Sequence, residues 1–132
     1  MLGVTPEEVG KLAIEKGIPT IIDYFNDDVV EKILKEMTRV SKSSIVSFPN
    51  FAFKPMREMF YNEGKAPKIS GWYGYNWYDT PNVRFPSIND FLEFCEEKDI
   101  SIKESLYLDT LNNKKITDNP NLNADSAIFV IS

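Results

Sequence analysis

The stretch Asp27 to Phe48, DDVVEKILKEMTRVSKSSIVSF, decides the fold class of this chain. Asn26-Asp27-Asp28 is typical of a helix start, where such side chains accept hydrogen bonds from free main-chain N–H groups. The helix that follows carries apolar residues at helical spacing and ends in the basic run Arg39 to Lys42, which suits the negative end of its dipole. Ser44 to Phe48 then predicts a β-strand, which Pro49 must end because proline cannot continue a central ladder. A helix followed directly by a strand indicates an α/β fold. The apolar helix positions are Val29, Val30, Ile33, Leu34 and Met37.

The C-terminal part of the sequence extends this pattern. Ser87-Ile88-Asn89-Asp90 is a capping box, which predicts a second clear helix start. Ile100 to Asp109 alternates apolar and polar residues, as a strand does. Ala127 to Ile131 is a continuous apolar run, which predicts a closing strand buried on both faces and paired antiparallel with its predecessor. The predicted buried side of the helix consists of Ile88, Phe91, Leu92, Phe94 and Cys95.

Further elements are predicted on both sides of the opening stretch. Thr5-Pro6-Glu7-Glu8 is a capping box with proline at the first helical position, and Gly17 is placed to end that helix. Ile18 to Phe25 predicts a short strand, and Phe51 to Asn62 contains a helix from about Lys54. A chain of 132 residues is large enough to bury one core without disulfides, so we expect a single domain over residues 1–132.

Composition narrows the possible functions. A formal net charge of −5 argues against a nucleic-acid or anionic-membrane partner. No apolar run approaches the roughly 20 residues of a membrane span, and the single cysteine, Cys95, cannot form an internal disulfide. We therefore expect a soluble, cytoplasmic protein. Histidine is absent, which excludes Ser-His-Asp and Cys-His catalysis and His-containing zinc sites, and no metal site is predicted.

The long connection from Gly64 to Phe85 concentrates aromatic residues: both tryptophans and three of the six tyrosines lie between Trp72 and Tyr78. Connections longer than about 15 residues in a compact domain are usually functional or contain small strands. One interpretation is substrate or partner recognition, in which rigid aromatic rings give contact area and polar groups give orientation. The other is a structural corner, with a turn over packed aromatic side chains. The candidate residues are Trp77, Tyr78, Asp79, Thr80 and Asn82.

Two other polar or reactive side chains are candidates for a role. Asn50 follows the strand Ser44 to Phe48 at its carboxyl end, where α/β proteins place ligands. Its side chain either faces such a crevice or caps the following segment. Cys95 lies on the apolar face of its helix, beside Phe91 and Leu92, and is predicted to be an unreactive core residue.

Three strings carry a resemblance to a known family: Leu34 to Val40 (LKEMTRV), Ile45 to Phe51 (IVSFPNF) and Trp77 to Asn82 (WYDTPN). Together with the helix around Asp90-Phe91 and the final apolar strand, they resemble MetW, a methionine-biosynthesis branch of the class I S-adenosylmethionine-dependent methyltransferase fold. The resemblance covers residues 31 to 132. It implies a Rossmann-like, three-layer α/β sheet with an antiparallel C-terminal strand pair. Gly3 to Phe25 is similar to the second strand, helix and third strand of such a domain.

The sequence departs from this family in the half that binds the cofactor. The Gly-rich loop that lets the backbone approach the cofactor is missing, because the glycines before position 64 are Gly3, Gly10 and Gly17. A further strand is missing where Asn26-Asp27-Asp28 leads directly into a helix. Asp23, at the end of the third strand, is the candidate for cofactor contact, or else a polar strand end or helix cap. We therefore expect a reduced methyltransferase-like sheet and no cofactor, S-adenosylmethionine being implied by the family alone.

The resemblance implies a role in methionine biosynthesis, where the family is associated with homoserine O-acyltransferase. Three hypotheses stay open. The first is MetW-like support of this acyltransferase without catalysis; the second is a non-catalytic oligomerisation or ligand-binding module; the third is a residual S-adenosylmethionine-dependent methyltransferase. The residues that would catalyse a reaction are unknown. Because missing central strands leave ladder edges bare, we also predict a homo-oligomer that covers such an edge.

Overall fold

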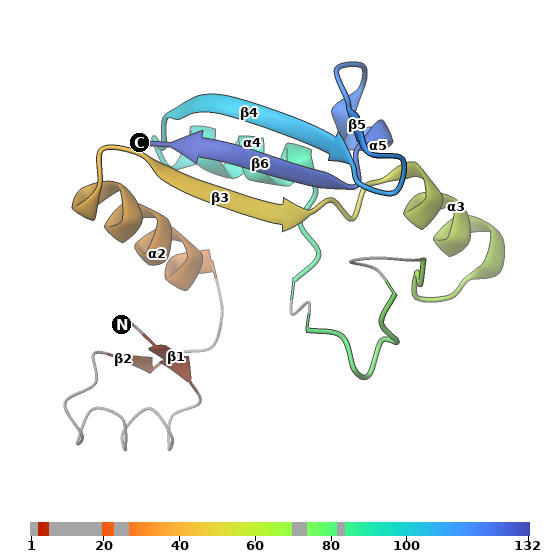
Figure 1. Cartoon of the computed structure of the whole chain (residues 1–132). Helices are drawn as coiled ribbons and strands as arrows, with labels where there is room; N and C mark the ends of the chain where they lie inside the picture. The colour runs from red at the N-terminus through yellow and green to blue at the C-terminus, as the bar shows by residue number, and fades with distance from the viewer. Residues whose placement is uncertain (1–2, 6–19, 23–26, 70–73, 82–83) are drawn as a thin grey trace. The chain divides into compact units, whose positions relative to one another are not determined.

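The structure, a computed structural model, describes residues 3–5, 20–22, 27–69, 74–81 and 84–132 (Figure 1). The chain divides into two compact units, Met1–Lys42 and Ser43–Ser132. The helix predicted from Pro6 to Gly17 lies outside the described residues, and so do the candidate site residues Asp23 and Asn82.

The first unit contains a small parallel sheet. Strand β1 (Gly3–Thr5) pairs with β2 (Thr20–Ile22), and Val4 lies opposite Ile21. A parallel pair cannot be joined by a tight turn, because the chain must return to the same end of the sheet before the second strand begins. Strand β2 lies inside the segment that the sequence predicts to be extended.

Helix α2 (Asp27–Val40) follows in the same unit and confirms the helix predicted from the opening stretch. Val29 and Leu34, both on its apolar stripe, are buried. On the polar side, Lys35 Nζ lies 2.6 Å from Glu31 Oε1, one turn earlier. Such exposed pairs stabilise a helix by only about 0.3–0.5 kcal/mol. The apolar stripe therefore matters more for this helix than its ion pairs.

The second unit is built on a four-stranded antiparallel sheet. Its strands, in spatial order, are β3 (Ser44–Pro49), β6 (Ser126–Ile131), β4 (Ile102–Asp109) and β5 (Lys114–Lys115). Strand β6 is antiparallel to both of its neighbours, so β3 and β4 run in the same direction. The predicted α/β class and the antiparallel C-terminal pair are thus confirmed. The three-layer Rossmann-like arrangement stays a prediction.

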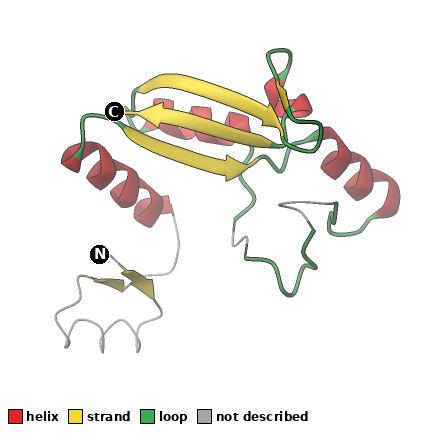
Figure 2. Ribbon diagram, in the orientation of Figure 1, coloured by secondary structure: helices red, strands yellow, loops and turns green. Residues whose placement is uncertain are grey.

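Two longer helices lie between β3 and β4 in the chain, α3 (Lys54–Glu63) and α4 (Ile88–Glu97). Figure 2 shows α4 running behind the sheet, along one of its faces. A short helix, α5 (Pro120–Asn123), precedes β6. Within the described ranges, every helix is too short or too polar to span a lipid bilayer.

An aromatic cluster forms the core between α4 and the sheet. Phe129 of β6 is fully buried, and its ring centroid lies 4.7 Å from Phe91 of α4, 5.8 Å from Phe48 and 5.9 Å from Tyr107. Tilted and edge-on aromatic pairs contribute about 0.5–1.5 kcal/mol each beyond burial of their area. Phe129 therefore joins three strands and one helix at a single point.

Burial along β6 corrects one prediction. Ala127, Phe129 and Ile131 are buried, but Ile128 and Val130 between them are only half-buried. Helix α4 covers the face that carries the first set, whereas a run buried on both faces needs equal cover on each. The prediction for Leu92 is also wrong: it is 37% exposed, because it lies off the stripe of α4 that meets the sheet.

The ends of α3 and α4 follow local rules. Ser87 Oγ accepts from Asp90 N at 3.0 Å, and Asp90 Oδ2 accepts from Ser87 N at 2.8 Å, which confirms the predicted capping box. Helix α3 begins at Lys54, as predicted, and ends at Glu63, with Gly64 as its C-cap. Gly64 has φ of 61°, a left-handed conformation that glycine adopts without steric cost, and its N–H donates to the Phe60 carbonyl.

Candidate functional site

A pocket of about 520 Å³ lies where α3, the aromatic connection and the start of α4 meet. Ligand sites in proteins typically measure about 300–1,000 Å³. The pocket is built entirely from the second unit. Its lining is mainly apolar, with Met56 and Phe60 from α3 and Tyr75, Trp77 and Phe85 from the connection.

Side-chain hydrogen bonds of Asn50 hold two of the segments that contribute lining residues to this pocket. Asn50 is fully buried, and its Oδ1 accepts from Ala52 N at 3.1 Å and from Ile88 N at 3.2 Å. Its Nδ2 donates to the carbonyls of Asn121 at 3.0 Å and Ala124 at 2.8 Å. The amide thus joins the entries of α3 and α4 to the loop before β6. Asn50 itself is not among the described residues that line the pocket, although the next two residues, Phe51 and Ala52, are.

A second buried polar residue, Asp125, extends the hydrogen-bond network of Asn50. We call these two residues and their hydrogen bonds the bracket. Asp125 was not singled out by the sequence. Its main chain accepts from Asn50 N at 2.7 Å and donates to the Leu108 carbonyl at 2.9 Å. Its Oδ2 accepts from Thr110, from N at 2.9 Å and from Oγ1 at 2.5 Å. The end of β3, the end of β4 and the start of β6 are therefore held together by the main chain of Asp125 and by its carboxylate. The two hydrogen bonds to Oδ2 offset part of the cost of burying this carboxylate.

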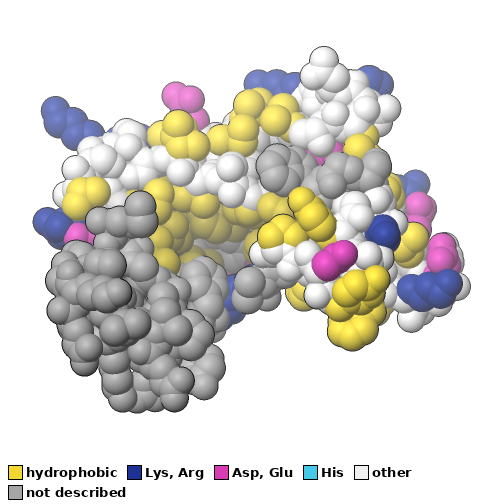
Figure 3. Space-filling model, turned by 60° about the horizontal axis from the view of Figure 1, so that its bottom comes forward, with side chains coloured by type: hydrophobic (Ala, Val, Ile, Leu, Met, Phe, Trp, Pro, Cys, Tyr) yellow, Lys and Arg dark blue, Asp and Glu magenta, His cyan; other side chains and the backbone are white. Residues whose placement is uncertain are grey.

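The candidate residues of the aromatic connection divide into two groups. Trp77 and Thr80 line the pocket, together with Asn76, whereas Tyr78 and Asp79 do not. Trp77 is 77% exposed and Tyr78 is 71% exposed. The aromatic side chains at these two positions are therefore open to solvent, and are not packed beneath a turn. In Figure 3, one of several groups of hydrophobic side chains lies at the lower right of the view, on the side where α3 and the connection lie in Figure 1.

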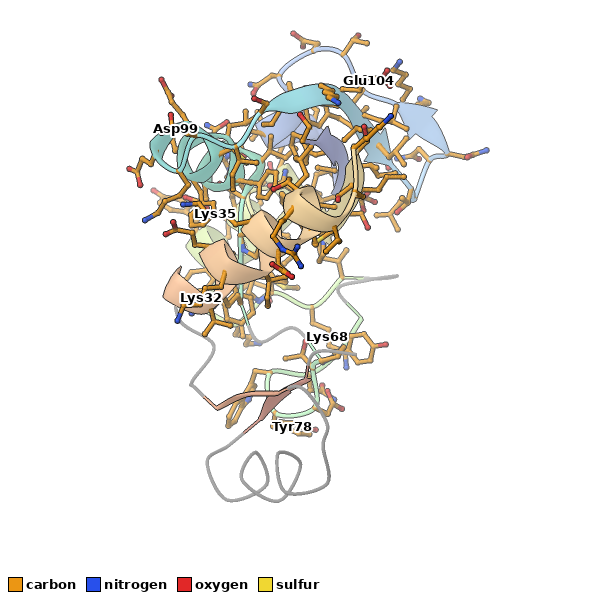
Figure 4. The ribbon with its side chains drawn as sticks, turned by 90° about the vertical axis from the view of Figure 1, so that its left-hand side faces the viewer. Lys32, Lys35, Lys68, Tyr78, Asp99 and Glu104 are labelled. Atoms are coloured by element: carbon orange, nitrogen blue, oxygen red, sulfur yellow. The ribbon has the colours of Figure 1, made fainter. Side chains whose placement is uncertain are left out.

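A small network of polar contacts shapes this part of the connection. Asp79 N donates to the Asn76 carbonyl at 3.2 Å, and Asn76 Nδ2 donates to Asp79 Oδ2 at 3.0 Å. Lys68 Nζ donates to Asn76 Oδ1 at 2.8 Å. Figure 4 shows Lys68 and Tyr78 in the same part of the second unit, away from Glu104 on β4. A hydrogen-bonded turn thus spans residues 76–79.

Arg57 is the positively charged residue that lines the pocket, and sequence reasoning missed it. Its Nε donates to the Ala52 carbonyl, and its Nη2 donates to the Asn121 carbonyl at 3.3 Å. These main-chain acceptors orient the guanidinium group. Nothing in the local sequence separates Arg57 from an ordinary exposed arginine, because its partners depend on the course of the chain at residues 52 and 121.

The remaining candidate, Cys95, is buried, and burial raises the pKa of its thiol to about 11. Because the thiolate is the reactive form, this cysteine is a poor nucleophile at neutral pH. In the described part of the chain, no three acidic or cysteine side chains gather as they would around a metal ion. The polar residues at the start of α4, Ser87 and Asp90, are engaged in the capping box. The largely apolar lining of the pocket is suited to binding an apolar group.

Comparison with known proteins identifies the family. The family described as "Methionine biosynthesis protein MetW" matches residues 26–131. This chain belongs to the MetW family. A bifunctional methionine biosynthesis protein, MetXA/MetW, from Rhodopirellula baltica is 34% identical over 129 residues, covering 88% of this chain and 21% of the relative. The chain thus spans about a fifth of the length of that relative. No solved structure matches it significantly.

Membership in the MetW family confirms the resemblance carried by the three strings, and it assigns the chain a role in methionine biosynthesis of the MetW type. The matched range begins just before α2 and ends with β6. It includes every described residue that lines the pocket, and it includes Asn50 and Asp125. The pocket and the bracket beneath it therefore lie within the MetW part of the sequence.

Proposed function

We propose that this protein supports homoserine O-acyltransferase in methionine biosynthesis and does not itself catalyse a reaction. The observation that carries the proposal is the Rhodopirellula relative, whose name joins MetXA and MetW in one polypeptide. A covalent link raises the effective concentration of two modules for each other, so fusion favours pairs that work in contact. In this proposal, the present chain makes the same contact as a separate protein.

The chemistry of the pocket supports a binding role. Exposed aromatic side chains are over-represented where proteins contact each other, and charged pairs at such sites set orientation. The pocket offers Trp77, Phe60 and Phe85 for contact area and Arg57 for orientation. A general acid or base needs a titratable group that is free to exchange its proton with a substrate. Asp90, the acidic residue in the lining, is instead hydrogen-bonded within the capping box.

Two observations support the absence of S-adenosylmethionine, the cofactor that the resemblance to methyltransferases implies. Gly3, Gly10 and Gly17 are spaced too widely to make the Gly-rich loop through which such a backbone approaches its cofactor. Asn50, the polar residue after β3, has both ends of its amide engaged by main-chain groups and offers none to a ligand. We therefore propose that no cofactor is bound. Calorimetry with S-adenosylmethionine should give no measurable heat of binding, and a micromolar dissociation constant would contradict the proposal.

The decisive experiment for the main proposal uses purified homoserine O-acyltransferase from the same organism. We expect the two proteins to co-elute in gel filtration and the acyl-transfer rate to rise when this chain is added in equimolar amount. The control is bovine serum albumin at the same concentration. If the chain neither binds the acyltransferase nor changes its rate, the proposed function is wrong.

A homo-oligomer remains a second proposal, from the sheet topology. Strand β3 is an edge strand, since β6 is its sole partner in the described sheet. Ile45 on β3 is 70% exposed, and edge strands with exposed apolar residues favour pairing with another chain. Mass measurement in solution tests this proposal. A strictly monomeric, folded chain would remove it without affecting the acyltransferase proposal. The cytoplasmic location stays a prediction.

A further inference from the structure

The aromatic walls of the pocket are open to solvent. Four lining residues remain substantially exposed: Phe60 at 62%, Tyr75 at 46%, Trp77 at 77% and Phe85 at 64%. Pockets for small molecules usually bury most of the ligand surface, which needs walls that are themselves enclosed. A pocket with exposed walls instead resembles the surface onto which a protein segment docks with one anchoring side chain.

Buried apolar residues pack next to these exposed walls. Met56 is almost fully buried and forms a small core with Phe53, against which Phe51 and Ile69 pack. The ring of Phe51 meets the exposed ring of Phe85 edge-on, with centroids 4.8 Å apart. A rigid base with exposed aromatic walls is the arrangement expected of an interaction hot spot, because little order is lost when the partner binds.

Arg57 indicates which charge a partner of this pocket should carry. Among the described residues, no carboxylate lies within 4.0 Å of its guanidinium, whereas Lys54 on the same helix lies 3.7 Å from Glu58. The Arg57 group is held in place by two main-chain carbonyls and keeps further N–H donors for a partner. A planar guanidinium with fixed orientation recognises a carboxylate through paired hydrogen bonds.

We propose that this pocket is the docking site for a segment of homoserine O-acyltransferase that places an apolar or aromatic side chain against Phe60 and Trp77 and a nearby carboxylate on Arg57. This inference rests on the proposed function and specifies its contact surface. The occupant is a protein segment rather than a free ligand, because the walls are exposed. It carries an acidic residue, because the arginine in the lining has no acidic partner among the described residues.

Matched pairs of variants test the docking site. Phe60→Ala removes an aromatic wall, and Tyr61→Ala is its control, since Tyr61 is 90% exposed and does not line the pocket. Arg57→Glu reverses the charge in the pocket, and Lys54→Glu makes the same change in charge on the same helix outside the lining. Binding of each full-length variant to immobilised acyltransferase is measured as a dissociation constant, with circular dichroism to verify folding.

We expect Phe60→Ala and Arg57→Glu each to weaken binding by about 30-fold, as loss of a hot-spot residue does. The two control variants should stay within about threefold of the wild type. Raising the salt concentration should weaken binding of the wild type, since exposed charge pairs are screened by salt. It should have little effect on the residual affinity of the Arg57→Glu variant for the acyltransferase.

The outcomes separate this inference from the proposed function. If the wild type binds the acyltransferase and the lining variants bind as well as their controls, the docking site is wrong and the proposed function stands. If the wild type does not bind at all, both are wrong. If Phe60→Ala dissociates an oligomer of this chain and leaves acyltransferase binding intact, the pocket holds a second copy of the chain, and the proposed occupant is wrong. Because Phe60 is largely exposed, its variant remains informative even if Arg57→Glu fails to fold.

Discussion

Replacing Asn50 by alanine tests the bracket beneath the pocket most directly. The substitution removes the partner of four main-chain groups: the N–H groups of Ala52 and Ile88, and the carbonyls of Asn121 and Ala124. The bonds to Ile88 and Ala124 are buried, so water cannot replace them, and each unsatisfied group costs about 1–3 kcal/mol. The other two bonds are only partly buried and are replaced in part by water. We therefore expect a loss of about 3–4 kcal/mol.

The assay is urea unfolding followed by far-ultraviolet circular dichroism. With a slope of about 1.5 kcal/mol/M, a loss of this size moves the midpoint by about 2 M. Asn89→Ala is the matched control, because Asn89 is exposed. Exposed substitutions usually change stability by less than about 0.5 kcal/mol. A loss below about 1 kcal/mol for Asn50→Ala would refute the reasoning, since at least two buried groups would then have found other partners.

Asn50→Asp refines the same test through pH. The new carboxylate has the shape of the amide, but one oxygen must face the carbonyls of Asn121 and Ala124. Burial and these carbonyls raise the pKa of the carboxyl in the folded state above its unfolded value of about 3.9. A raised folded pKa means that stability is greatest at low pH and is lost as pH rises through that value. The gap to wild type should therefore widen from pH 4 to pH 7; a constant gap would contradict this.

Three further predictions address the core, the helix cap and the thiol. Phe129→Ala should cost about 3–5 kcal/mol of unfolding free energy, because a fully buried ring is lost; a cost as small as that of Phe60→Ala, at an exposed position, would contradict the packing. Ser87→Ala should cost about 1 kcal/mol, measured by thermal unfolding; an unchanged midpoint would show that the capping box contributes nothing. Cys95 should react with a thiol reagent at pH 8 at least about 100-fold more slowly than glutathione, since the pKa of its thiol is raised to about 11. Rapid labelling of the folded protein would disprove this.

Local sequence rules were sufficient for much of the fold. Helix α2, strand β3 and the capping box at Ser87 were predicted from residues that lie within one element or one turn. Helical spacing, a strand-ending proline and a serine three residues before an acid act over short distances, so the sequence itself contains the relevant partners. The MetW resemblance was also available from sequence, because its strings are contiguous.

The pocket was predicted only in outline. Trp77 and Thr80 were candidates and do line it, but Arg57 and Phe60 were not singled out. A helix pattern shows which side of α3 is polar, but not which polar residue meets another segment. The exposure of Trp77 and Tyr78 was also undecided, since an aromatic residue in a connection packs or stays exposed depending on what the rest of the chain places beneath it.

By itself, the sequence determined the elements, the α/β class and the family. Tertiary structure decided the role of its polar residues. The sequence left two interpretations of Asn50 open, a residue that faces a ligand and a residue that caps the following segment. In the folded chain, two of its hydrogen-bond partners come from Asn121 and Ala124, which lie 71 and 74 positions further along the sequence. No local sequence pattern marked Asp125 as a buried, hydrogen-bonded residue, because its partner Thr110 lies 15 positions earlier, across a strand pair. Hydrogen-bond partners at such distances are brought together only when β3, β4 and β6 pair, so no local pattern can specify them.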